Sequence, residues 1–202
     1  GDTVQDVPIA MVGGKGVFTK ELEVALLEKE VDLAVHSLKD LPTELPEGLC
    51  LGAVPVRENP QDVLISQSYG SVEDLPEGAR VGTSSLRRRL QLLAHRPDLR
   101  VEDIRGNVPT RVRKLQEEQF DAILLAAAGL NRLGLAHLIT QILPPEIMLP
   151  AVGQGALALE LRKDDDWLRA LVAQLEDSAT AAAVKAEGGL LRGMGGGCQT
   201  PL

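Results

Sequence analysis

Nine arginine and lysine residues stand close together in one stretch of an otherwise acidic chain. The 202 residues include 21 Lys and Arg against 29 Asp and Glu, which gives a formal net charge of -8. The nine are Arg87, Arg88, Arg89, Arg96, Arg100, Arg105, Arg111, Arg113 and Lys114. Guanidinium groups are forked donors that match carboxylates, so the stretch predicts a pocket for an anionic ligand. A solvated helix face would explain the same composition.

A run of small hydroxyl residues directly precedes the first of these arginines. A strand ending at Val81 would deliver Thr83, Ser84 and Ser85 to the start of a helix that carries Leu86. Exposed amides, hydroxyls and the positive end of the helix dipole all suit an anion there. The alternative is that Ser84 or Ser85 only caps the helix.

Asp40 is the candidate catalytic carboxylate. It follows the apolar strand predicted at 31–36, and Lys39 precedes it directly. In open α/β sheets the carboxyl ends of strands face the ligand crevice. Asp40 could form a structural ion pair with Lys39, or it could be kept ionised by nearby cations while it stabilises a cationic intermediate.

The two cysteines differ in their surroundings. Cys198 follows three glycines, so its sulfur can approach a bulky group, and a thiolate near arginines is nucleophilic. An inert loop cysteine is the alternative. Cys50 stands between two leucines and is expected to be an ordinary buried residue. Two cysteines cannot form a disulfide scaffold or a four-cysteine zinc site, which favours a reducing compartment.

Other functional classes are disfavoured. The glycine pattern at 153–158 fits a dinucleotide fingerprint but follows no clean strand, and no phosphate-binding loop or zinc-helix spacing occurs, so no metal site is expected. An aromatic share of 2% and the acidic charge disfavour nucleic acid. No apolar stretch is long enough to span a bilayer, and no signal peptide is seen. The start without Met suggests a fragment or a processed piece.

Helix-like and strand-like segments alternate, which predicts α/β layers with mainly parallel strands. A helix at 18–30 leads into the strand at 31–36. A strand at 101–104, a helix capped by Asn107 and continuing through Glu118, and a strand at 121–125 form a similar unit. The resemblance between the two units suggests two lobes. Turn-rich stretches at 54–62 and 143–152 are the predicted hinges, and two crossings would place a ligand cleft between the lobes.

Seven segments of the chain, taken in order, are informative together: VGGKGVFTKELE at 12–23, AVHSLKDLP at 34–42, VGTSSLRR at 81–88, RGNV at 105–108, LG at 133–134, LPAVGQG at 149–155 and GGCQTP at 196–201. With them the chain closely resembles the porphobilinogen deaminase (hydroxymethylbilane synthase) family over almost its whole length. The resemblance implies an enzyme that deaminates four porphobilinogen molecules and joins them into hydroxymethylbilane, in tetrapyrrole biosynthesis.

The resemblance also implies roles for individual residues. A dipyrromethane cofactor would be held by a thioether to Cys198, and Asp40 would manage the positive charge on each pyrrole. The residues matching cofactor ligands are Lys39, Thr83, Ser85, Arg87 and Arg88. Those matching the substrate site are Arg105, Arg111, Arg132, Ser37 and Gln154, and Lys15 and Phe18 belong to a lid.

The implied architecture is two periplasmic-binding-protein-like (type II) α/β lobes with a cleft between them, plus the start of a third α+β domain. Residues 1–56 and 153–175 would form the first lobe, 57–152 the second, and 176–202 the start of the third domain with the cofactor loop. The chain lacks the family's N-terminal strand and helix and most of its C-terminal domain. We expect a cytoplasmic monomer with no nucleic-acid or membrane partner. A non-catalytic module that binds an organic polyanion is the alternative function.

Overall fold

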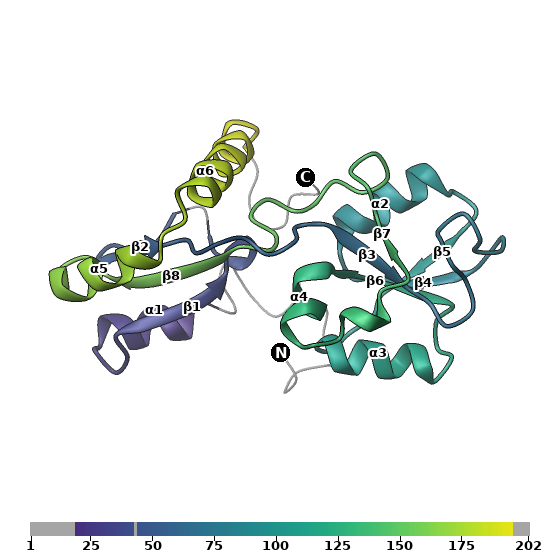
Figure 1. Ribbon diagram of the computed structural model, residues 1–202, viewed down its shortest axis with the longest axis horizontal. Helices are drawn as coiled ribbons and strands as arrows, with labels where there is room; N and C mark the ends of the chain where they lie inside the picture. The colour runs from purple at the N-terminus through teal and green to yellow at the C-terminus, as the bar shows by residue number, and fades with distance from the viewer. Residues whose placement is uncertain (1–18, 43, 196–202) are drawn as a thin grey trace. The chain divides into compact units, whose positions relative to one another are not determined.

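The computed structural model describes residues 19–42 and 44–195, which fall into two compact units. The continuous unit is Asn59–Ala151. The discontinuous unit comprises the described residues of Val7–Glu58 and Val152–Thr200. Figure 1 shows the ribbon of each unit. The predicted α/β class is confirmed for both, because each unit packs helices against a sheet.

The continuous unit is built on a mixed five-stranded sheet of order β5-β4-β6-β3-β7. Its strands are β3 (Asp62–Ile65), β4 (Arg80–Gly82), β5 (Arg100–Glu102), β6 (Ala122–Ala126) and β7 (Gln141–Ile142). β4 runs parallel to β5 and β6, whereas β3 runs antiparallel to β6 and β7. Its helices are α2 (Leu86–His95), α3 (Val108–Gln116), α4 (Ala127–Arg132) and the short 3-10 helix η3 (Ala136–Leu138).

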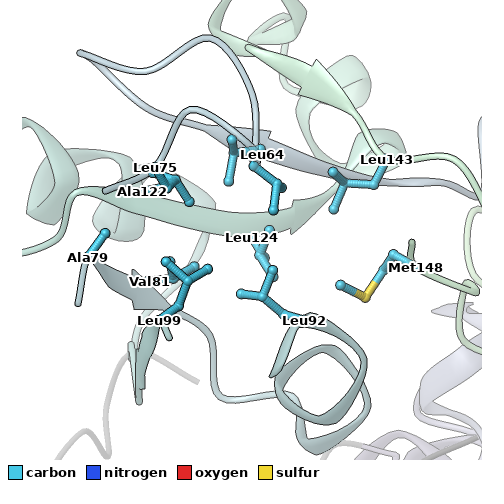
Figure 2. Close-up of a cluster of buried hydrophobic side chains, with 11 residues drawn as sticks. Leu64, Leu75, Ala79, Val81, Leu92, Leu99, Ala122, Leu124, Leu143 and Met148 are labelled. Atoms are coloured by element: carbon cyan, nitrogen blue, oxygen red, sulfur yellow. The ribbon is translucent and has the colours of Figure 1, made fainter. Parts of the chain in front are cut away.

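Alternating side chains of the central strands fill two separate cores in this unit. Leu64 and Leu124 belong to one cluster together with Leu92 of α2, as Figure 2 shows. Val63 and Ile123, their neighbours in sequence, belong to the other cluster with residues of α3 and α4. Because successive strand residues point to opposite faces, α2 covers one face of the sheet and α3 and α4 cover the other.

The discontinuous unit has a three-stranded sheet of order β1-β8-β2 among its described residues, and both pairings are antiparallel. Its elements are α1 (Lys20–Leu27), β1 (Leu33–Ser37), η2 (Leu38–Asp40), β2 (Leu49–Ala53), β8 (Leu157–Arg162), α5 (Asp166–Val172), η4 (Ala173–Leu175) and α6 (Ser178–Gly193). The expectation of mainly parallel strands is therefore wrong for this sheet. β8 arrives from more than a hundred residues away and lies between β1 and β2.

The two faces of the smaller sheet are covered by different helices. Leu26 of α1 packs with Ala34 and Leu49, whereas α5 packs on Leu159 and Leu161 of β8. Since residues opposite one another in an antiparallel pair share a face, Ala34 and its partner Glu160 lie on the α1 side.

Local signals in the sequence located several elements well. The Asn107 side chain caps α3 by accepting from the Thr110 amide at 2.9 Å, as predicted, although the helix ends at Gln116 rather than Glu118.

None of the helices in the described ranges has the length and apolar character needed to cross a bilayer.

Gly106 sets the turn that leads into α3. Its φ is +107°, and a Cβ built there would lie 2.5 Å from Cγ2 and 2.7 Å from Cβ of Thr110. Gly134 has a similar left-handed backbone, φ +69°, but a Cβ there would meet nothing within 4 Å. The two positions therefore separate backbone strain from steric overlap.

We predict that Gly106→Ala lowers the free energy of unfolding by about 2 kcal/mol, because strain and overlap add. Gly134→Ala, the matched control, carries the strain alone and loses about 1 kcal/mol. Urea unfolding of both variants measures the difference. Equal losses at the two positions would contradict the steric part of this account.

Candidate functional site

The hydroxyl groups just before α2 form hydrogen bonds with other groups of the protein. Ser85 caps the helix by accepting from the Arg88 amide at 3.4 Å. The Ser84 hydroxyl donates to the Ile104 carbonyl at 2.7 Å, and buried Thr83 accepts from the Ser85 amide at 3.2 Å. The capping alternative is confirmed for Ser85, and these contacts fix the strand-to-helix turn.

A buried carboxylate lies between the two arginines of the first turn of α2. Asp62, the first residue of β3, is fully buried, and Arg87 and Arg88 are 5% and 6% exposed. Arg87 Nη1 lies 2.6 Å from Asp62 Oδ2, and Arg88 donates to Asp62 Oδ1 from Nε at 3.0 Å and from Nη2 at 2.8 Å. Backbone carbonyls also bind both guanidiniums, that of Leu149 binding Arg87 and that of Leu124 binding Arg88.

One carboxylate faces two guanidiniums, so this cluster carries a surplus of positive charge. Burial lowers the pKa of Arg88, and the charge of Arg87 lowers it further, while Asp62 raises it. The solvated-face alternative is wrong for Arg87 and Arg88, because both side chains are buried. Their predicted binding of ligand carboxylates stays a prediction, and Asp62 is an internal partner that the prediction did not include.

Arg111 increases the positive charge near this cluster. It is half-buried on α3, and its Nε donates to the Gly106 carbonyl at 2.8 Å. Burial lowers the pKa of Arg111, and the charges of Arg88 and Arg105 lower it further. No carboxylate pairs with Arg111 in the described part of the chain. Within residues 19–42 and 44–195, Asp62 is thus the one carboxylate that forms ion pairs with Arg87, Arg88 or Arg111.

The other predicted basic residues of this unit are less enclosed. Arg105 is half-buried, and its carbonyl accepts from Lys114 Nζ at 3.1 Å. Arg132 is exposed in the last turn of α4. The continuous unit thus carries seven of the predicted site residues: Thr83, Ser85, Arg87, Arg88, Arg105, Arg111 and Arg132.

Asp40 lies at the end of η2, immediately after β1. The start of η2 is held by the Leu38 amide, which donates to the Ala156 carbonyl at 3.0 Å. Asp40 is accessible to water, yet protein atoms displace enough hydration to raise the pKa of its carboxyl group. The charges of Lys39 and His36 lower that pKa, so the cations expected near Asp40 are present but are outweighed by burial.

The loop directly before β8 contacts α6 through Arg57 and Glu187. Gln154 is 1% exposed, and its carbonyl accepts from Arg57 Nε at 2.8 Å. Arg57 also forms an ion pair with Glu187 of α6 at 2.5 Å, and Glu187 accepts from the Gly153 amide at 2.8 Å. The discontinuous unit carries the remaining described candidates, which are Ser37, Lys39, Asp40 and Gln154.

Three predicted residues, Lys15, Phe18 and Cys198, lie outside the described residues. Cys50 lies on β2 and is half-buried rather than fully buried as expected. Its side chain packs against the cluster that α5 covers.

Sequence reasoning missed two buried acidic residues that matter to the site. Asp62 begins a strand whose residues are all buried, and Glu160 lies within the apolar strand β8. The available signal was the placement of a carboxylate within an apolar strand, because a buried charge needs a partner. Glu160 has one in His36, whose Nε2 lies 2.8 Å from its Oε2.

Solved structures share the fold at low sequence identity. A nutrient binding protein from Burkholderia cenocepacia bound to methionine matches with a TM-score of 0.51 and 14% identity, covering 81% of this chain and 78% of that one. A periplasmic substrate-binding protein of an ABC transporter from Coxiella burnetii matches with a TM-score of 0.50 and 16% identity, covering 83% and 80%. The predicted periplasmic-binding-protein-like fold is confirmed.

Curated relatives match the whole chain at much higher identity. The porphobilinogen deaminase of Brevibacillus brevis is 56% identical over 202 residues, and that of Nitratidesulfovibrio vulgaris (strain Hildenborough) is 58% identical over 202. The chain spans 65% and 64% of the lengths of these two proteins. The family model described as porphobilinogen deaminase, dipyromethane cofactor binding domain, matches residues 1–170. The chain therefore belongs to the porphobilinogen deaminase family.

Proposed function

We propose that the protein containing this chain is a transferase of tetrapyrrole biosynthesis that deaminates four porphobilinogen molecules and joins them into hydroxymethylbilane. The observation that carries this proposal is the match to porphobilinogen deaminases over all 202 residues at more than half identity. A non-catalytic polyanion receptor is not favoured, because the solved binding proteins share only the fold.

The local excess of guanidinium groups over carboxylates around Arg87, Arg88 and Arg111 supports an anionic ligand. Each porphobilinogen carries an acetate and a propionate, so a growing chain is a polyanion that needs cations. Burial and the charges of Arg88 and Arg105 disfavour the charge of Arg111, so a carboxylate partner would stabilise it. We assign Arg105, Arg111, Arg132, Ser37 and Gln154 to substrate.

The same charge fits the dipyrromethane cofactor, whose pyrroles also carry carboxylates. Lys39, Thr83, Ser85, Arg87 and Arg88 would hold those groups, and Cys198 would bind the cofactor through a thioether. When bound, the cofactor supplies the primer on which the product grows. The turn fixed by Thr83 and Ser85 keeps the first turn of α2, and hence both arginines, in place.

We assign Asp40 the central chemical role. Loss of ammonia from a porphobilinogen leaves positive charge on the pyrrole, and a fixed carboxylate stabilises charge that develops beside it. The η2 turn, held by the hydrogen bond from the Leu38 amide, supplies the position. Burial raises the pKa of Asp40, and the charges of Lys39 and His36 partly offset that rise.

The remaining expectations complete the proposal. We propose a cytoplasmic monomer, a lid that includes Lys15 and Phe18, and a third domain that starts near residue 176. In the described residues α6 belongs to the discontinuous unit, to which the Arg57–Glu187 ion pair fastens it. These contacts would hold the segment that precedes Cys198 close to β8.

The first prediction from the proposed function concerns Asp40. In the native-length protein, Asp40→Asn keeps the shape of the side chain but removes the charge, so turnover falls at least ~100-fold. The measurement is the rate of hydroxymethylbilane formation by protein that carries its cofactor. A near-normal rate in a folded, loaded variant would remove Asp40 from the catalytic role.

The second prediction compares two arginines on α3. Arg111→Gln weakens binding of the carboxylated substrate roughly 10- to 100-fold, the loss expected for one charged hydrogen bond. Arg113→Gln is the control, because Arg113 is exposed and pairs only with Glu117 at 2.6 Å among the described residues. Steady-state kinetics of both variants give the comparison.

A measurement of stability distinguishes a substrate-binding role of Arg111 from a structural role. Since burial and two neighbouring cations oppose the charge of Arg111, Arg111→Gln leaves the free energy of unfolding unchanged or raises it. A large loss of stability together with normal kinetics would show Arg111 to be a structural residue.

The third prediction is that Cys198, and not Cys50, carries the cofactor. Cys50 lies on β2 and packs against apolar residues that come mainly from β8 and α5. Peptide mapping by mass spectrometry of the native-length protein, produced with porphobilinogen available, should find the added mass on the Cys198 peptide. Added mass on the Cys50 peptide, or full activity of Cys198→Ala, would overturn the assignment.

A further inference from the structure

Two side chains of α2 hold the backbone of Leu149. Gln91 donates from Nε2 to the Leu149 carbonyl at 3.3 Å, and its Oε1 accepts from the Leu149 amide at 2.7 Å. Nη1 of Arg87 donates to the same carbonyl. Arg87 and Gln91 stand four residues apart on one helix, so they lie on the same face of it. Together they bind both polar groups of the Leu149 backbone.

Leu149 lies close to the point where the chain leaves the continuous unit, which ends at Ala151. The side chain of Met148 is fully buried in the same cluster as Leu92, as Figure 2 shows. The side chain of Leu149 is 60% exposed, and Pro150 has no amide hydrogen to donate. Among the described residues, the hydrogen bonds to Leu149 are therefore the last ones before the unit ends.

Arg87 and Arg88 are held in different ways. Arg88 donates from Nε and Nη2 to Asp62 of β3 and from Nη1 to the Leu124 carbonyl of β6, so the sheet holds its whole guanidinium. The Arg87 side chain has one hydrogen-bond acceptor among the described residues, the Leu149 carbonyl, and its ion pair with Asp62 involves the same atom, Nη1. The orientation of Arg87 therefore depends on a segment outside the sheet.

Two nitrogen atoms of Arg87 are left for another partner. Neither Nε nor Nη2 is hydrogen-bonded within the described part of the chain. Both keep some contact with solvent, since neither is one of the enclosed polar atoms that lack a partner. Nε and Nη2 are neighbouring donors on one edge of the guanidinium, and such an edge can bind a carboxylate through two parallel hydrogen bonds.

We propose that Gln91 is a positioning residue for the cofactor. By binding both polar groups of the Leu149 backbone, Gln91 fixes the carbonyl that orients Arg87, and Nε and Nη2 of Arg87 then bind a carboxylate of the dipyrromethane. Gln91 acts through Arg87 and does not touch the cofactor itself. The inference rests on the proposed role of Arg87 as a cofactor ligand, but the orientation of Arg87 can be measured without cofactor.

Gln91→Met in the native-length protein tests the structural part, because methionine has a similar length and makes neither hydrogen bond. In the apoprotein, hydrogen exchange of the Leu149 amide should become about 10-fold faster. ¹⁵N relaxation should show increased motion of the Nε–H group of Arg87, whose signal is assigned by its loss in Arg87→Lys. The control is Gln116→Met, which replaces an exposed glutamine at the end of α3 and should change neither measurement.

Cofactor attachment gives the functional readout. After porphobilinogen is added to the apoprotein, the rate at which the cofactor mass appears in intact-mass spectra should fall about 10-fold in Gln91→Met. The free energy of unfolding in urea should stay close to the wild-type value, because both hydrogen bonds of Gln91 are exposed. A merely structural glutamine would instead lower stability and leave the loading rate of the folded protein unchanged.

The outcomes separate this inference from the proposed function. Unchanged motion of Arg87, or unchanged loading, in folded Gln91→Met overturns the positioning role even if Arg87→Gln takes up no cofactor. Normal loading of folded Arg87→Gln overturns the cofactor role of Arg87 even if exchange and relaxation change as expected. If Gln91→Met does not fold, the wild type decides, because a Leu149 amide that exchanges without protection overturns the role of Gln91.

Discussion

One buried carboxylate, that of Asp62, pairs with the two buried guanidiniums of Arg87 and Arg88. This pairing offsets part of the positive charge at the start of α2. Arg87 and Arg88 stand in the first turn of α2, where the helix dipole and their mutual repulsion both disfavour cations. Asp62 offsets part of that cost and ties α2 to β3, while the carbonyls of Leu124 and Leu149 take up further donors. Removal of the carboxylate would leave two buried charges uncompensated. The two guanidiniums outnumber that carboxylate, and the proposed ligand would supply further carboxylates to them.

Two aspartates, Asp62 and Asp40, lie in very different surroundings. Asp62 is fully buried and engaged by two arginines, so it acts as a fixed structural anion. Asp40 is accessible at the end of η2 and is influenced by cations without being locked to an arginine among the described residues. The first position suits packing, and the second suits stabilisation of charge that appears only during a reaction.

Local features of the sequence were enough to predict some of the local structure that holds the candidate residues. The strand-to-helix turn at Ser85 and the Asn107 cap depend on neighbouring residues, and both occur in the structure. The partners of Arg88 and His36 could not be predicted, because Asp62 is 26 residues and Glu160 is 124 residues away. Such pairs depend on strand order and register. The antiparallel course of β8 was missed for the same reason, since periodicity within a segment carries no information about its direction in a sheet.

The central position of β8 has a consequence for the order in which the chain can acquire its structure. In the described residues β1 and β2 do not pair with each other, and both form their ladders with β8. Once the chain has been synthesised up to Ala151, all five strands of the larger sheet are present. The smaller sheet still lacks β8, its central strand. The continuous unit can therefore fold during synthesis, before β8 is available to pair with β1 and β2. Closing the smaller sheet spans a loop of more than a hundred residues, and a compact, already folded insert reduces the entropy lost in that closure.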